Sequence, residues 1–227
     1  MERKIFVWDQ KFLPQIEIRD LEFKERLRKV LRLKNGDTII LLNNFEEKAV
    51  YQIKDISKVS LVLISKEERK LNPPKEIDVF LPFVRKQVLE EMIFDATMLG
   101  VNKIYLFRAE RSQYQLSEIS ERFYKIIAQA MEIVEWQKTP SLEILNDFEE
   151  HVDQSSIVLD KEGEIFELKF LENRLKIFAG PEGGWSEKEK EFFKNKGAKM
   201  ISLGNVNLKT EFALRVFLSL ANFPIIS

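Results

Sequence analysis

A glycine loop that follows an apolar segment is the first part of this sequence whose residue types suggest chemistry. GPEGGWSEKE runs from Gly180 to Glu189, and Ser186 and Glu189 have the spacing of a capping box, which predicts a helix just after the loop. Its glycines allow positive φ angles and a close approach of ligand to backbone. The loop has neither the P-loop nor the dinucleotide-binding spacing, and Glu182 would repel a phosphate. It is therefore interpreted as a site for a cationic or hydroxyl-bearing ligand, or as a tight turn without one.

A second loop of similar construction lies further along the chain. In LGNVNLKTEFALR, from Leu203 to Arg215, an expected strand ends at a glycine, a short polar loop follows, and a helix begins. Loops at the carboxyl ends of neighbouring strands of open α/β sheets lie together, and ligands bind there. The two loops are therefore predicted to form one pocket.

The elements that must position these loops follow from hydrophobic periodicity. After a charged segment with a Pro-Pro pair, Ser65 to Glu76, strands alternate with helices, which is typical of a parallel α/β sheet. Before it, closely spaced strands favour a small β-barrel. One helix is expected there, Leu21 to Leu31, with Leu21, Leu27, Val30 and Leu31 on one side. The expected strands are 5–8, 38–44, 49–56, 59–64, 77–83, 103–107, 156–159, 175–179 and 200–203, and the other expected helices are 84–99, 116–136, 186–196 and 208–222.

Composition excludes several kinds of site. The 227 residues include no cysteine and one histidine, His151, which excludes disulfides, thiolate zinc sites, a cysteine nucleophile and a histidine-rich metal site. The 36 basic and 37 acidic residues nearly balance, so a globally basic nucleic-acid binder is not indicated. No long apolar run suggests a membrane span or a signal peptide, and a cytoplasmic protein is expected.

Four stretches together resemble one known family. They are GPEGG-x-S-x-x-E, LG-x-x-x-L-[RK]-T-E-x-A, KVLRLKNGDTIILLNN and ATMLGVNKIYLFRAERS. With these, the chain resembles the bacterial 16S ribosomal RNA (uracil-N3)-methyltransferases of the RsmE type, in the SPOUT superfamily. The resemblance implies an α/β fold: a PUA-like RNA-binding β-barrel over residues 1–70 and a SPOUT domain with a deep trefoil knot over 71–227.

The resemblance also implies ligands and partners. The cofactor would be S-adenosylmethionine, the partners would be 16S rRNA or the small ribosomal subunit and a second copy packed through the knot helices, and neither DNA nor a membrane is expected. The implied cofactor-binding residues are Leu159, Gly180, Pro181, Glu182, Gly183, Gly184, Leu203, Gly204, Val206, Leu208 and Thr210. The candidates for RNA contact, each of which could equally be a solvated surface charge, are Arg26, Arg28, Arg32, Arg85, Arg108 and Arg111.

Methylation of uracil at N3 requires loss of the N3 proton, which a nearby cation and a carboxylate can assist. The implied catalytic residues are Lys209, which would orient the substrate, and Glu211 or Glu182, which would order the pocket or relay the proton. A simpler role for Glu211 is to stabilise the positive end of the following helix. Trp185 is interpreted either as a stacking surface for a base or as a buried aromatic residue.

The sequence departs from the family pattern at several positions expected to face RNA. Asp95 and Met98 replace a basic residue and a glutamate, and Lys209 stands where an arginine is usual, a change that is not conservative at a bidentate site. Two alternatives therefore stay open. The chain could be a knotted methyltransferase for a different RNA site, or a non-catalytic protein that binds RNA or assists ribosome assembly.

Overall fold

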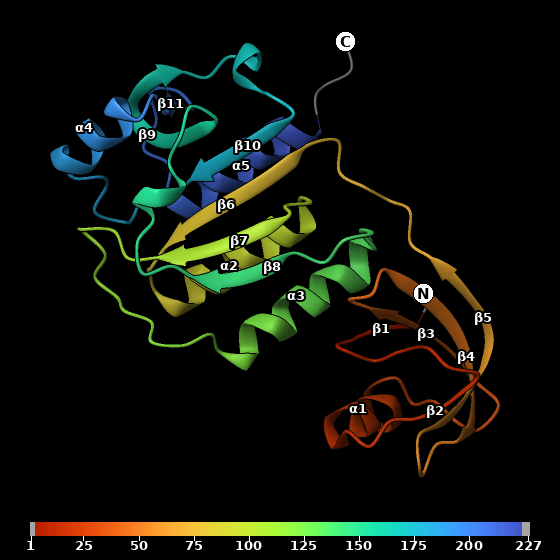
Figure 1. The fold of residues 1–227 in the computed structure, drawn as a ribbon. Coiled ribbons are helices and arrows are strands. Elements are labelled where there is room, and N and C mark those ends of the chain that lie inside the picture. The colour runs from red at the N-terminus through yellow and green to blue at the C-terminus, as the bar shows by residue number, and fades with distance from the viewer. Residues whose placement is uncertain (1–2, 224–227) are drawn as a thin grey trace. The chain divides into compact units, whose positions relative to one another are not determined.

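The computed structural model describes residues 3–223, which form two compact units (Figure 1). The first consists of the described residues up to Asn72 together with Met131–Thr139. The second consists of Pro73–Ala130 and the described residues from Pro140 onward. Among the described residues, no helix has the length and apolar character needed to cross a membrane.

The first unit contains a five-stranded mixed sheet. Its strands, in spatial order, are β1 (Lys4–Val7), β3 (Thr38–Asn43), β4 (Glu47–Asp55), β5 (Ser60–Glu68) and β2 (Gln15–Glu17). β1 pairs with β3 in parallel, and the other pairs are antiparallel. The buried faces enclose a core that includes Leu27, Leu41, Tyr51 and Leu61. The expected strands are present, and β2 is an addition whose three residues carry too little alternation to be recognised.

The helix of the first unit differs from the expected one in its second half. α1 (Leu21–Glu25) is followed directly by a π-helical stretch, Arg26–Val30. Leu27 is buried as expected, but the prediction was wrong for Leu21 and Val30, which are 71% and 70% exposed. The π turn has more residues per turn than an α-helix, so the 3.6-residue spacing that grouped Val30 with Leu27 does not hold in this stretch. Phe23 and Leu27 form the buried face instead.

Polar contacts bind the segment Met131–Thr139 into the first unit. The Glu132 carboxylate accepts hydrogen bonds from Arg26 Nη1 and Nη2 at 2.9 and 2.6 Å, and from the Phe6 amide at 2.9 Å. Glu135 pairs with Lys4 and, at 2.7 Å, with Lys48. The last turn of α3 (Glu121–Val134) thus belongs to the first unit. Arg26, expected to contact RNA, has its guanidinium engaged by Glu132.

The second unit contains a six-stranded, all-parallel sheet. Its strands, in spatial order, are β11 (Lys199–Ser202), β9 (Ser156–Ile165), β10 (Arg174–Phe178), β6 (Glu76–Pro82), β7 (Lys103–Phe107) and β8 (Ser141–Ile144). The apolar runs of the central strands are buried almost throughout, as expected for a sheet covered on both faces. After β6, the chain adds β7 and β8 on one side of that strand. The later strands β9, β10 and β11 lie on its other side. The point of reversal lies between β6 and β10, and it is where open α/β sheets bind ligands.

Three helices of this unit follow strands whose carboxyl ends lie at the same edge of the parallel sheet. α2 (Lys86–Met98) follows β6, α4 (Glu187–Asn195) follows β10, and α5 (Thr210–Asn222) follows β11. α2 and α5 pack together, and Arg215 Nη2 pairs with Asp95 Oδ2 at 2.6 Å. The expected α/β class, with an N-terminal mixed sheet followed by a parallel sheet, is confirmed.

An interruption in β9 shapes the region beside β10. β9 is longer than expected and pairs with β11 in two pieces, because Met200 is opposite Val158 while Ile201 is opposite Glu164. The intervening residues leave the ladder. Gly163 allows this path, since a Cβ there would lie 2.5 Å from the backbone of Met200 and Ile201. The sequence pattern gave no sign of this detour.

Candidate functional site

A cavity of about 700 Å³ lies where the loops after β9, β10 and β11 converge. Both glycine loops expected from the sequence line it, so the prediction of one pocket is confirmed. All eleven residues expected to bind a cofactor line the cavity, as do Lys209, Glu211, Arg85 and Arg111. The detour in β9 adds Asp160, Lys161 and Glu162, which were not expected.

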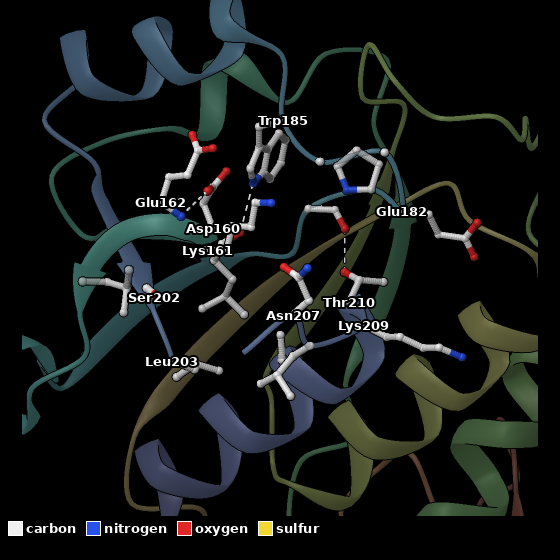
Figure 2. A pocket seen from close by; sticks show the side chains of 18 of the residues that line it. Asp160, Lys161, Glu162, Glu182, Trp185, Ser202, Leu203, Asn207, Lys209 and Thr210 are labelled. Atoms are coloured by element: carbon white, nitrogen blue, oxygen red, sulfur yellow. Dashed lines mark hydrogen bonds between the residues drawn. The ribbon is translucent and has the colours of Figure 1, made fainter. Parts of the chain in front are cut away.

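Two hydrogen bonds join the walls of the cavity (Figure 2). Thr210 Oγ1 donates to the Gly180 carbonyl at 2.5 Å, which connects the N-terminus of α5 to the first glycine loop. Trp185 Nε1 donates to the Leu159 carbonyl at 3.1 Å, which connects that loop to β9. The three loops therefore form one connected framework.

The glycines of the two loops are required for different structural reasons: some have positive φ angles, and others lie too close to a neighbouring side chain to carry a Cβ. Gly184 and Gly204 have φ angles of +70° and +118°, and a Cβ at either would meet no atom within 4 Å. Gly180 is required for a different reason, because its Cβ would lie 3.0 Å from Trp185 Nε1. Gly183 abuts Arg111 in the same manner, at 3.3 Å from its Cβ. Of the three glycines in the first loop, only Gly184 uses the positive φ angle that glycine allows.

Trp185 is a buried aromatic residue and not a surface for a base. Its side chain is 1% exposed and packs edge-on against Phe193, with ring centroids 4.8 Å apart. Its ring is parallel to that of Phe107 at 6.0 Å. This cluster holds the indole where its N–H reaches Leu159 and its face covers Gly180.

A loop after β7 braces the first glycine loop from outside. Arg111 Nη1 donates to the carbonyls of Gly183 and Trp185 at 3.3 and 3.1 Å. Ser186 Oγ donates to Glu110 at 2.6 Å, and Glu189 forms the expected capping box with Ser186. Arg111 was expected to contact RNA, and the role of Glu110 was not anticipated. The distance of about 75 residues between these partners explains why no local pattern could reveal them.

The three residues expected to take part in catalysis lie on two loops of the cavity. Glu182 pairs with Arg85 Nε at 3.1 Å, and both Glu182 and Lys209 extend to the same side of Figure 2, away from Trp185. The hydrogen bond and charge of Glu182 raise the pKa of Arg85. Glu211, in the first turn of α5, is 8% exposed. Its position agrees with the simpler role of stabilising the helix N-terminus.

The wall formed by the detour in β9 carries a lysine among carboxylates. Lys190 Nζ lies 2.6 Å from Glu162, 3.3 Å from Glu187 and 3.9 Å from Asp160. The hydrogen bond to Glu162 raises the pKa of Lys190 despite partial burial. The side chains of Glu162, Asp160 and Lys161 are grouped on the Trp185 side of the cavity (Figure 2). The cavity therefore has charges of both signs on its walls and suits a zwitterionic ligand better than a polyanion.

The remaining expected RNA contacts lie outside the cavity. Arg28 and Arg32 are exposed in the first unit, and Arg108 is exposed after β7. Within residues 3–223, no group of histidine, cysteine and acidic side chains could hold a metal ion.

Comparison with known proteins identifies relatives of this chain. A family model described as an RNA methyltransferase domain matches residues 71–222, more than half of the chain. The ribosomal RNA small subunit methyltransferase E of Rickettsia conorii is 27% identical over 88% of this chain and 86% of its own. Ribosomal RNA small subunit methyltransferase E 2 of Borreliella burgdorferi is 27% identical over 92% and 90%. A crystal structure of a ribosomal RNA small subunit methyltransferase E from Neisseria gonorrhoeae bound to S-adenosyl methionine has the same fold, with a TM-score of 0.83, 17% identity and 96% of each chain covered.

Proposed function

This chain belongs to the RNA methyltransferase family, and on that premise we propose that it transfers a methyl group from S-adenosylmethionine to N3 of a uridine in 16S rRNA. The observation that carries the proposal is the cavity formed by two glycine loops and joined by the bond from Thr210 to Gly180. It lies at the carboxyl ends of β9, β10 and β11 in a parallel sheet and extends to Arg85 after β6, beside the reversal point, where a small ligand is expected. Relatives named as small subunit methyltransferases of ribosomal RNA support the choice of substrate.

The residues of the cavity fit S-adenosylmethionine. A volume of about 700 Å³ is within the usual range for a small-molecule site. Gly184 and Gly204 leave open space above their backbones, so that a ligand can approach the main chain closely. The bound cofactor would supply an activated methyl group. Residues of three loops would hold it: Leu159, Gly180, Pro181, Glu182, Gly183, Gly184, Leu203, Gly204, Val206, Leu208 and Thr210.

The side chains at the cavity have separable tasks in this reaction. Lys209 would orient the RNA by its charge, and its exposure immediately before α5 supports this role. Of the two roles considered for Glu182, its ion pair favours ordering the pocket over relaying a proton. Glu211 would order the same region from the first turn of α5. Positioning of this kind supplies much of the rate acceleration when the methyl donor is already activated.

The first unit would act as a PUA-like RNA-binding domain. Arg28 and Arg32 are exposed there, and both are suited to contact phosphates. Arg26 would not contact RNA, because its guanidinium is engaged in a bidentate pair with Glu132.

The chain would act as a homodimer through α5. Phe212 and Val216, one turn apart on this helix, are 47% and 39% exposed, and Phe223 beyond its end is 52% exposed. Apolar side chains in a row on one helix face suit a second copy of the same surface. This row begins two residues from Thr210, so packing there would stabilise the N-terminus of α5 at the cavity.

The proposal is tested by incubating purified protein with labelled S-adenosylmethionine and rRNA that lacks the modification. We expect transfer of label to 16S rRNA. Transfer to another RNA would favour a knotted methyltransferase with a different target. Binding of RNA without any transfer would favour an assembly protein.

A further inference from the structure

A buried carboxylate lies in the wall of the cavity that the detour in β9 forms. Asp160 follows directly after Leu159, lines the cavity, and has a side chain that is only 7% exposed. Its Oδ1 accepts a hydrogen bond from the amide of Glu162 at 2.7 Å, which fixes the orientation of the carboxylate. A charged group in such a place is costly without hydrogen-bond partners, and the tasks assigned above to the cavity residues do not include it.

The second oxygen of this carboxylate can accept further hydrogen bonds. Lys190 Nζ lies 3.9 Å from Asp160 Oδ2, which is beyond the range of a hydrogen bond. That lysine is held instead by Glu162 at 2.6 Å and by Glu187 at 3.3 Å. Because each carboxylate oxygen has two lone pairs, Oδ2 has capacity for donors from a ligand in the cavity.

Charge and hydrogen-bonding capacity restrict the ligand group that Asp160 can bind. An ammonium group there would be repelled by Lys190 and by Lys161, which also lines the cavity. The edge of adenine presents a donor beside an acceptor, whereas a carboxylate only accepts. The ribose of a nucleoside presents two adjacent hydroxyls, which are neutral donors. An acidic residue binds a ribose hydroxyl in the same manner in dinucleotide-binding α/β sheets.

We propose that Asp160 binds the ribose of S-adenosylmethionine by accepting hydrogen bonds from its hydroxyls. The inference rests on the proposed function and deepens it, because it names the residue that selects a ribonucleoside cofactor over one with a deoxy sugar. Lys190 is a positioning residue: from α4 it holds the side chain of Glu162, whose amide orients Asp160. The side chains of Asp160 and Glu162 lie together on the Trp185 side of the cavity (Figure 2).

Calorimetry tests this contact without turnover. The ligands are S-adenosylhomocysteine, which is the product left after methyl transfer, and its 2′-deoxy and 3′-deoxy forms. For the wild type, we expect loss of a bound hydroxyl to weaken binding about 10-fold, because a hydrogen bond to a charged group is lost. Asp160→Asn keeps an oxygen for the Glu162 amide and should weaken binding of S-adenosylhomocysteine by a similar factor. Asp160→Ala should bind the ribose and deoxy compounds with nearly equal affinity.

Asp147→Asn is the matched control. Asp147 Oδ1 likewise accepts a hydrogen bond from the amide two residues further on, that of Glu149, at 2.8 Å, but Asp147 is exposed and does not line the cavity. This variant should bind all three compounds as the wild type does. Lys190→Gln should weaken binding less than Asp160→Asn and should keep part of the preference for ribose. Circular dichroism verifies that each variant is folded.

Two results would overturn the inference. One is equal affinity of the wild type for the ribose and deoxy compounds. The other is a loss in Asp160→Ala that is the same for all three compounds, which would assign Asp160 a structural role only. If the wild type binds none of them, the proposed function fails together with the inference. If it binds them with a preference for ribose but methylates no RNA, only the proposed function fails.

Discussion

Thr210 connects the two glycine loops of the cavity through a single hydroxyl. Its Oγ1 donates to the Gly180 carbonyl, and the residue begins α5. Without the hydroxyl, the partly buried Gly180 carbonyl would have no hydrogen-bond donor in this place. Leaving such a group unpaired costs about 1–3 kcal/mol of free energy. The loop carrying Gly180 would then be less well fixed at the edge of the cavity.

Thr210→Val removes this hydroxyl while keeping the branched shape of the side chain. We expect the affinity for S-adenosylmethionine to fall about 10-fold, measured by calorimetry. Ser219→Ala is the matched control, because Ser219 lies on the same helix and its hydroxyl donates to the Arg215 carbonyl within that helix. Equal affinities for Thr210→Val and the wild type would show that the link does not order the site.

At the scale of elements, the segment Met131–Thr139 is held by charge. The Glu135 carboxylate lies between Lys4 and Lys48 and is 19% exposed. Partial burial alone would raise its pKa, but hydrogen bonds and charges from the two lysines outweigh burial and lower it. A carboxyl group whose pKa is lowered on folding stabilises the fold above its unfolded pKa. That contribution is lost as the pH falls through the folded pKa.

Glu135→Gln should therefore lower the free energy of unfolding by about 1–2 kcal/mol at neutral pH. The difference from the wild type should disappear below the lowered pKa, which lies under 4.5. Denaturant unfolding monitored by tryptophan fluorescence at several pH values measures both the difference in unfolding free energy at neutral pH and its disappearance in acid. Glu118→Gln, in an exposed loop, is the control and should not change stability. A Glu135→Gln deficit that persists in acid would contradict the role of the charge.

Elements with strong local patterns were predictable from the sequence, and those that depend on distant partners were not. The capping box of Ser186 and Glu189 fixed the start of α4, and β7 has the expected bounds. β8 has four residues and pairs only with β7, so its assignment depends on a neighbour that the local sequence does not reveal. The detour in β9 depends on Gly163 meeting β11. The candidate site shows the same difference. Both glycine loops were predicted from local sequence, but Glu110 and the carboxylates around Lys190, which involve contacts between distant parts of the chain, were not.

At the scale of the whole molecule, the exposed apolar row of α5 is the proposed interface of the homodimer. Val216→Glu places a charge in the apolar row, where it would be buried between two copies at a high cost. We expect the wild type to be a dimer by light scattering after gel filtration, and Val216→Glu to be a monomer with an unchanged circular dichroism spectrum. Ile64→Glu, at a 57% exposed site of the first unit, should remain a dimer. A monomeric wild type would contradict this use of α5.

The trefoil knot implied by the resemblance stays a prediction about the whole chain. Local hydrophobic periodicity carries no information on how one segment threads past another, so no reading of single elements could establish a knot. A crossing of the chain would have to be compatible with the observed strand order and with the packing of α5 against α2.

The proposed function is methylation of a uridine at N3 in 16S rRNA, with S-adenosylmethionine bound in the cavity between the glycine loops. The most direct measurement incubates the protein with S-adenosylmethionine and unmodified small subunits, and then maps the modified nucleotide by mass spectrometry. We expect one 3-methyluridine in 16S rRNA, reduced in Thr210→Val and unchanged in Ser219→Ala. A protein that binds the cofactor yet leaves 16S rRNA without 3-methyluridine would contradict it.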